Sequence, residues 1–229
     1  MNKTTILSLA LLALPAFAQE QHVSLIFDQT KHEDTTFSSG GSSATVSVDK
    51  TTAVGLRYGI AAAHFWNGAL DVEGTIRPRS NEKYFKINGV EESPANAGGS
   101  SIKMSDEYLS LGVGMRWTQV VDFGFMLEDR QEASILALDT GAGFSYTQRA
   151  SVNRPWLRLH AGYTFPIEAA VKPFVNIGYG FALAKKGTDT AGLNAINGAG
   201  STGQEAAIDF LSRSVLPKSE LSIEAGIRF

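Results

Sequence analysis

The final strand-like segment of this sequence alternates strictly between apolar and polar side chains, and it ends on an aromatic residue. Its polar face includes Glu224 and Arg228. A period of two predicts a β-strand with two chemically different faces. The apolar face consists of Leu221, Ile223, Ala225, Ile227 and Phe229.

Seven further segments alternate in the same way, and each has the length of about ten residues that crosses a bilayer at a tilt. Together with the final strand they predict an all-β fold, an antiparallel transmembrane β-barrel of eight strands. The segment from Thr118 to Ala133 is long for a turn and contains an apolar piece, so splitting it gives ten strands as the alternative. The seven segments are Val23–Thr30, Thr52–His64, Gly68–Arg77, Asp106–Trp117, Ser134–Thr147, Pro155–Phe165 and Pro173–Ala184.

The predicted connections alternate in length, as expected of a barrel with surface loops at one end and short turns at the other. A soluble β-sandwich would also contain short alternating strands. The membrane interpretation is favoured because glycine and charged residues, and not a second apolar layer, occupy the polar faces. Aromatic residues also gather near the strand ends, where the membrane interface would lie: Phe65, Trp66, Trp117, Trp156, Phe165 and Phe229. The expected loops are Lys31–Thr51, Pro78–Ser105, Gln148–Arg154 and Lys185–Ser219.

The N-terminus has the features of a secretory signal peptide. Lys3 precedes the apolar stretch from Ile6 to Leu14, and Ala16-Phe17-Ala18 forms a small-x-small cleavage site. An apolar stretch of this length is too short to span a membrane as a helix. The predicted organisation is therefore a signal peptide at residues 1–18 and one barrel domain at residues 19–229.

Composition excludes several classes of function. The sequence has no cysteine, so disulfides, thiolate metal sites and cysteine nucleophiles are impossible. A formal net charge of −3 offers no general attraction to nucleic acid. We expect no cofactor and no metal site.

Charged residues of both signs fall on the polar, lumen-facing sides of the predicted strands. In the narrow interior of an eight-stranded barrel such charges must pair. The preferred interpretation is a salt-bridge network that fills the lumen, and the alternative is a polar path for small solutes. The predicted lumen network comprises Arg57, Asp71, Glu73, Arg77, Arg116, Asp139, Arg158, His160, Glu224 and Arg228.

His160 could indicate a lipid-modifying enzyme, but such chemistry needs a nucleophile and an acidic partner beside the histidine. Gly162, not serine, is the next residue on its face, so no catalytic residue is predicted. Cations near the outer mouth could neutralise lipopolysaccharide phosphates, or they could form an ordinary solvated rim. They are Lys31, Arg79, Lys83, Arg149, Arg154, Lys185, Lys186, Arg213 and Lys218.

With its signal peptide, strand spacing and closing strand from Leu221 to Phe229, the sequence resembles the small outer-membrane β-barrel proteins of Gram-negative bacteria. These include the OmpX/Ail-type, opacity-type and OmpW-type proteins and the barrel domain of OmpA. The resemblance implies a monomer in the cell outer membrane, in contact with lipopolysaccharide and inserted by the barrel-assembly machinery. It implies a structural, adhesion or surface-recognition role through the loops, with an unknown host or surface ligand. The alternatives are a narrow channel for small or apolar solutes and a lipid-modifying enzyme.

Overall fold

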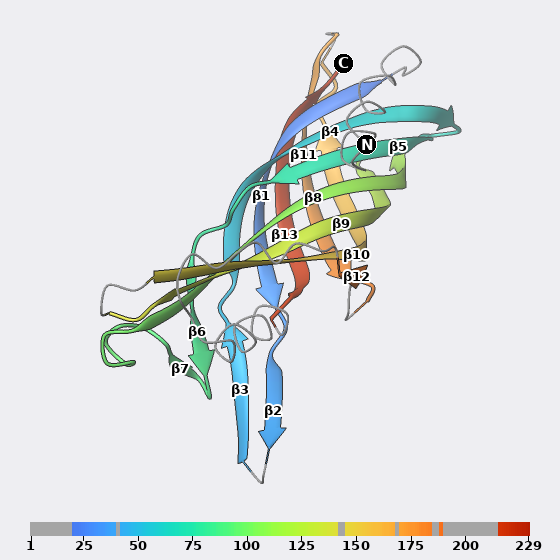
Figure 1. Ribbon diagram of the computed structural model, residues 1–229. Coiled ribbons are helices and arrows are strands. Elements are labelled where there is room, and N and C mark those ends of the chain that lie inside the picture. The colour runs from blue at the N-terminus through green and yellow to red at the C-terminus, as the bar shows by residue number, and fades with distance from the viewer. Residues whose placement is uncertain (1–19, 40–41, 142–144, 168–169, 185–187, 190–214) are drawn as a thin grey trace, which may run out of the picture.

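The computed structural model describes residues 20–39, 42–141, 145–167, 170–184, 188–189 and 215–229. Within them, eight long antiparallel strands form a closed ring (Figure 1). In the order in which they pair around the ring, the strands are β1 (Gln21–His32), β4 (Thr51–Phe65), β5 (Gly68–Arg77), β8 (Ser101–Thr118), β9 (Asp122–Asp139), β10 (Ser145–Thr164), β11 (Lys172–Ala182) and β13 (Pro217–Arg228).

The ring closes between its first and last strands. β1 and β13 pair from His22 opposite Arg228 to Thr30 opposite Glu220 and beyond. At the end of the seam, the backbones of Gln21 and Phe229 exchange two hydrogen bonds, with N···O distances of 2.8 and 2.9 Å. A closed sheet pairs the backbone polar groups and leaves no free edge, as a protein surrounded by lipid requires. The prediction of eight strands is confirmed, and the alternative of ten is wrong.

The predicted fifth strand, Ser134–Thr147, is wrong in position. It combines the end of β9, the residues between the two strands and the start of β10. The segment that we expected to be a long turn, Thr118–Ala133, is mostly β9, and the expected loop Gln148–Arg154 lies inside β10. The remaining seven predicted strands overlap β1, β4, β5, β8, β10, β11 and β13.

Two local features explain this error. Phe125, Met126 and Leu127 are consecutive apolar residues, and Met126 faces inward with 1% of its surface exposed, so the period of two is hidden. β9 in fact ends at Asp139, whose carboxylate accepts a hydrogen bond from the Gly141 N–H at 2.9 Å. Gly141 has a φ of +69°, a conformation that glycine adopts readily.

The barrel is inside-out compared with a soluble protein. Leu25, Leu56 and Ile177 point outward and are 58%, 55% and 59% exposed, whereas Arg57 on the inner face is 1% exposed. The apolar side chains of β13 also face outward: Leu221, Ile223, Ala225, Ile227 and Phe229. This distribution places lipid outside and charge inside, as in a transmembrane β-barrel. None of the described residues forms a helix that is long and apolar enough to span a membrane.

One end of the barrel, here called the termini end, contains Gln21, Phe229 and the short β4–β5 and β8–β9 turns. Aromatic rings gather on its outer surface. Trp117 stacks on Phe123 with 5.7 Å between ring centroids, and Phe65 packs edge-on against Trp117 at 6.0 Å. Such rings suit a membrane interface.

The opposite end, here called the loop end, carries additional strands (Figure 1). β2 (Thr35–Ser39) and β3 (Ser42–Val48) form a hairpin, and β3 pairs with β6 (Lys83–Ile87), which also pairs with β7 (Val90–Glu91) and β8. β12 (Thr188–Asp189) pairs with β10. β3, β6 and the loop-end parts of β8 and β9 form a small apolar core together with Val215. Its residues are Val46, Val48, Phe85, Met104, Leu136 and Val215.

Candidate functional site

The interior of the barrel contains a chain of alternating guanidinium and carboxylate groups. Arg57 on β4 donates to Glu224 on β13 at 2.7 Å, and its Nε lies 3.4 Å from Glu73 on β5. Arg158 on β10 bridges the same Glu73 and Glu128 on β9, with an Nε···Oε1 distance of 2.7 Å to Glu128. Side chains from five strands are therefore connected across the lumen by ion pairs.

Arg130 on β9 extends this network toward the loop end. Its Nη1 donates to Glu220 at 2.9 Å, and its guanidinium carbon lies 4.3 Å from the ring centroid of Tyr108 and 4.2 Å from that of Trp156. Arg154 lies 5.9 Å from the same Trp156 ring. Cations at these distances are attracted to the negative face of an aromatic ring. Charge and aromatic rings thus fill this level of the barrel together.

Arg77 on β5 forms another part of this filling. It pairs with Asp28 at 3.4 Å and with Asp106, and it lies 4.8 Å from the ring of Tyr108. Because Asp28 lies on β1 and Asp106 on β8, one guanidinium joins strands that are not neighbours in the ring. Arg77 and Arg130 therefore both lie against the ring of Tyr108.

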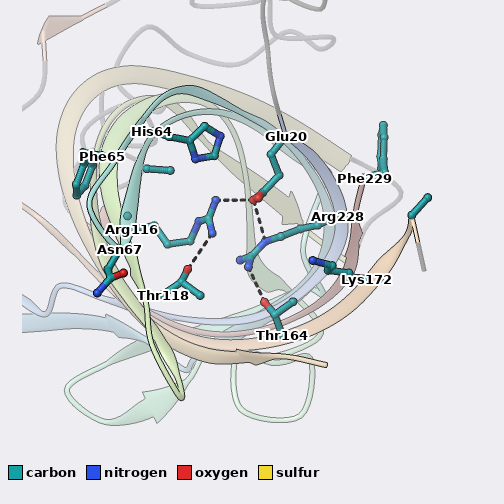
Figure 2. A pocket seen from close by; sticks show the side chains of 13 residues that line it. Glu20, His64, Phe65, Asn67, Arg116, Thr118, Thr164, Lys172, Arg228 and Phe229 are labelled. Carbon is teal, nitrogen blue, oxygen red and sulfur yellow. Dashed lines mark hydrogen bonds and ion pairs between the residues drawn. The ribbon is translucent and has the colours of Figure 1, made fainter. Parts of the chain in front are cut away.

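At the termini end, two further arginines lie around the mouth of the lumen (Figure 2). Arg116 on β8 donates to Asp71 at 2.8 Å and to Glu20 at 2.6 Å. Arg228 on β13 donates to Asp122 at 2.8 Å, and its Nε lies 3.7 Å from Glu20. Glu20 therefore bridges the two guanidinium groups.

Here the lumen widens into a cavity of about 550 Å³, which we call the vestibule. Figure 2 shows Arg116, Arg228, Lys172 and Glu20 among its labelled side chains. The vestibule is lined by Glu20, His64, Phe65, Asn67, Gly68, Ala69, Arg116, Thr118, Thr164, Ala170, Lys172, Arg228 and Phe229.

The structure buries nine of the ten residues that the sequence assigns to the lumen network. Asp139 is different: it is exposed, lies at the last position of β9 and caps the Gly141 turn. Its placement in the lumen followed from the misplaced fifth strand. The nine buried residues are Arg57, Asp71, Glu73, Arg77, Arg116, Arg158, His160, Glu224 and Arg228.

Several members of the network were missed from the sequence. Four lie on β9, in the segment that we expected to be a turn, and Arg154 lies where we expected a surface loop and is fully buried against Glu132. Others could have been found from side-chain parity, because Asp28 and Glu220 lie opposite the apolar faces of β1 and β13. The missed charged residues are Asp28, Asp106, Asp122, Glu128, Arg130, Glu132, Arg154 and Glu220.

Trp156 also differs from expectation. We expected this residue at the membrane interface, but its side chain is fully buried in the lumen against Arg130. Its position in the sequence contained the necessary signal, because it shares the face of Arg158 and not that of Leu157.

His160 lies in the lumen, with 8% of its surface exposed. Its ring packs over Gly124, where an added Cβ would approach Nε2 to 2.7 Å. No hydrogen bond reaches its Nδ1 within the described ranges. Among the residues that the structure describes, no cluster of three histidine, aspartate or glutamate side chains has the geometry to hold a metal ion.

No family model and no curated protein matches this sequence. Among solved structures, a major outer membrane protein from Thermus thermophilus is similar at 12% identity, with a TM-score of 0.51 over 91% of this chain and 98% of that one. Ail, the attachment invasion locus protein of Yersinia pestis, is similar at 13% identity, with a TM-score of 0.41 over 92% of this chain and 98% of that one. The Thermus match, the closed ring and the inside-out polarity agree on one conclusion: the chain has the fold of a small outer-membrane β-barrel protein.

Proposed function

We propose that this protein resides in the outer membrane of a Gram-negative bacterium and acts in surface recognition or adhesion through its loop end, on a barrel that is closed to solutes. The apolar core of the loop-end strands carries this proposal. Met104 and Leu136 come from the continuations of β8 and β9, and Val46, Val48 and Phe85 come from β3 and β6. The strands beyond the apolar band therefore form a packed sheet that can present a binding surface.

The orientation follows from the two ends. Short turns are typical of the periplasmic side of such barrels, and longer excursions are typical of the outer side. The β4–β5 turn consists of two residues, whereas the connection from β1 to β4 includes a complete hairpin. The termini end thus faces the periplasm and the loop end faces outward. Secretion would depend on the predicted signal peptide, residues 1–18, which lies outside the described residues.

Ion pairs stabilise the loop-end sheet. Lys86 on β6 contacts both carboxylate oxygens of Asp49 at 2.8 Å. This hydrogen bonding raises the pKa of Lys86 above its ordinary value. The contact joins the end of the β2–β3 hairpin to the next strand of the sheet, so it favours one arrangement of the exposed strands.

A groove on the outer wall supports lipopolysaccharide as a lipid partner. It has a volume of about 460 Å³, and it combines the apolar side chains of Ile76 and Leu109 with the half-exposed guanidinium of Arg149. Arg149 pairs with Glu107 in the same groove, so a lipid phosphate would compete with this carboxylate. Cations at such a boundary attract lipid phosphates, while the apolar part suits an acyl chain. Of the other cations that we expected at the mouth, Arg79 and Lys31 are exposed, whereas Lys185, Lys186 and Arg213 lie outside the described residues.

The assembly route and oligomeric state belong to the same proposal. The outward face of β13 ends at Phe229 on the seam, which suits recognition by the barrel-assembly machinery. A closed ring without a free edge supports a monomer. No catalytic role and no cofactor is proposed.

Two measurements test the closed barrel and its surface role. In planar bilayers, the refolded wild-type protein should give no stepwise conductance; reproducible single-channel openings would favour the channel alternative. For recognition, bacteria that display the protein should bind a coated panel of glycans and extracellular-matrix proteins better than cells with an empty vector. Replacing residues 35–48 by a two-residue turn should abolish the difference, while the heat-dependent band shift of the barrel is retained. If cells that display the shortened protein bind as well as cells that display the wild type, the loop end does not have the proposed role.

A further inference from the structure

The vestibule at the termini end has the features of an anion-binding site. Arg116, Arg228 and Lys172 bring three cationic groups to one cavity (Figure 2). Lys172 on β11 stands directly opposite Arg228 on β13 in the strand pairing. Like charges at directly opposed positions repel each other, so this arrangement is stabilised when a negative group lies between them.

Three carboxylates contact these cations, and they differ in how far their side chains are exposed. The side chains of Asp71 and Asp122 are 2% exposed and are held by Arg116 and Arg228, respectively. The side chain of Glu20 is 31% exposed. It precedes β1, at the edge of the described chain. Glu20 is therefore the carboxylate that an external anion can replace at the lowest cost.

The present contacts of Glu20 leave one donor unused. The Nε of Arg228 is buried and has no hydrogen-bond partner among the described residues, although Glu20 lies 3.7 Å away. Glu20 binds Arg116 closely, at 2.6 Å, but it does not bind Arg228 Nε within hydrogen-bonding distance. A free oxyanion that is not tethered to the backbone can satisfy both guanidinium groups, and such charge-assisted bonds are among the stronger ones.

Ion pairs cross the lumen beyond the vestibule, so we infer that the vestibule opens only at the termini end. Arg57 and Arg158 pair with Glu73 and Glu224 across the next part of the lumen. A ligand that enters from the termini end would meet these ion pairs and stop.

From these observations we propose that the vestibule binds the carboxylate or phosphate group of a small ligand, and that the side chain of Glu20 is the internal competitor for this site. The site is independent of the proposed role of the loop end. Only the compartment that supplies the ligand, the periplasm, follows from the proposed orientation.

The test uses the mature chain, refolded in detergent and labelled with ¹⁵N at arginine, and NMR of the arginine Nε–H groups. Sodium phosphate and sodium acetate are the probes, and sodium chloride at equal ionic strength is the reference. In the Glu20→Gln variant, each active probe should shift the Arg228 signal in a saturable way. The Glu20→Gln variant should bind the probe about tenfold more tightly than the wild type, because the Glu20 carboxylate no longer competes through its charge-assisted hydrogen bond. The Arg130 signal, from the closed interior, should stay constant and reports the intact fold.

Two further variants locate the site. Adding Arg116→Gln to Glu20→Gln should abolish saturation, and adding Lys172→Gln should weaken it; the lysine variant serves where the arginine variant does not fold. Saturable binding of phosphate alone, or of acetate alone, supports the site and identifies the chemistry of its ligand. The proposal is overturned if neither probe saturates in Glu20→Gln, or if the wild type binds as tightly as Glu20→Gln. It also fails if both added variants leave the affinity unchanged.

Discussion

Replacing Arg130 by methionine tests whether the ion pairs of the lumen determine the stability of the barrel. Arg130 is 1% exposed, pairs with Glu220 and Glu128, and packs against the rings of Tyr108 and Trp156. Methionine keeps much of the volume but removes the charge. Removing one partner from a buried ion pair costs about 3–5 kcal/mol, because the other charge stays buried without compensation.

The two carboxylates should respond differently. Glu128 keeps a hydrogen bond from Arg158 at 2.7 Å, whereas among the described residues Glu220 keeps the Tyr108 hydroxyl at 3.4 Å. Most of the loss should therefore arise at Glu220. The double variant Arg130→Met with Glu220→Gln should recover part of it, with a coupling of about 0.5–3 kcal/mol, the range for residues in direct contact.

Urea-induced unfolding of the barrel in lipid vesicles, followed by the band shift between folded and unfolded protein, measures these free energies. Arg149→Met is the matched control, because Arg149 pairs with Glu107 on the outer wall with 47% of its side chain exposed. An exposed pair of this kind contributes only about 0–1 kcal/mol. If Arg130→Met costs no more than the control, or if the double variant is no more stable than the single one, the lumen network does not stabilise the barrel as argued.

Three further changes have defined outcomes. In Gly114→Ala, the new Cβ would lie 2.0 Å from the carbonyl oxygen of Phe125, so the barrel should lose about 1–3 kcal/mol, visible as heat modification at a lower temperature. Deleting Phe229 removes two backbone hydrogen bonds of the seam and should lower the folded fraction, whereas Phe229→Ala should retain most of it; equal losses would contradict the backbone explanation. Combining Tyr108→Ala with Trp156→Ala removes two buried rings from the lumen, and conductance should then appear in planar bilayers where the wild type gives none.

The architecture could be predicted because alternation is a local property of the sequence. From Leu109 to Trp117, every second residue is apolar, and β8 presents these residues to the outside. The same parity placed Arg57 and Glu73 inside. Where an inward position is itself apolar, as at Met126, the local signal fails, and the strand was placed wrongly.

The partners inside the lumen could not be predicted, because they depend on how strands distant in sequence meet across the barrel. Ser24 donates to Glu224, 200 positions away, and Arg57 reaches the same carboxylate over 167 positions. Parity identifies which side chains enter the lumen, but the height of each one follows from the register of the closed ring. The vestibule has the same origin, since Glu20, Arg116 and Arg228 meet only after closure.

The choice of cation in the lumen follows from the same geometry. Among the described residues, seven arginines and no lysines are buried, and nine buried carboxylates accompany them. Arg158 bridges Glu73 and Glu128, and Arg77 bridges two aspartates on separate strands. A planar guanidinium presents five donors in a fixed fork and can bind two carboxylates in different directions, whereas an ammonium is a compact point charge. Arginine can therefore satisfy an excess of buried acid and also connect opposite walls of the barrel, so the residues that balance the charge are the same ones that cross the lumen.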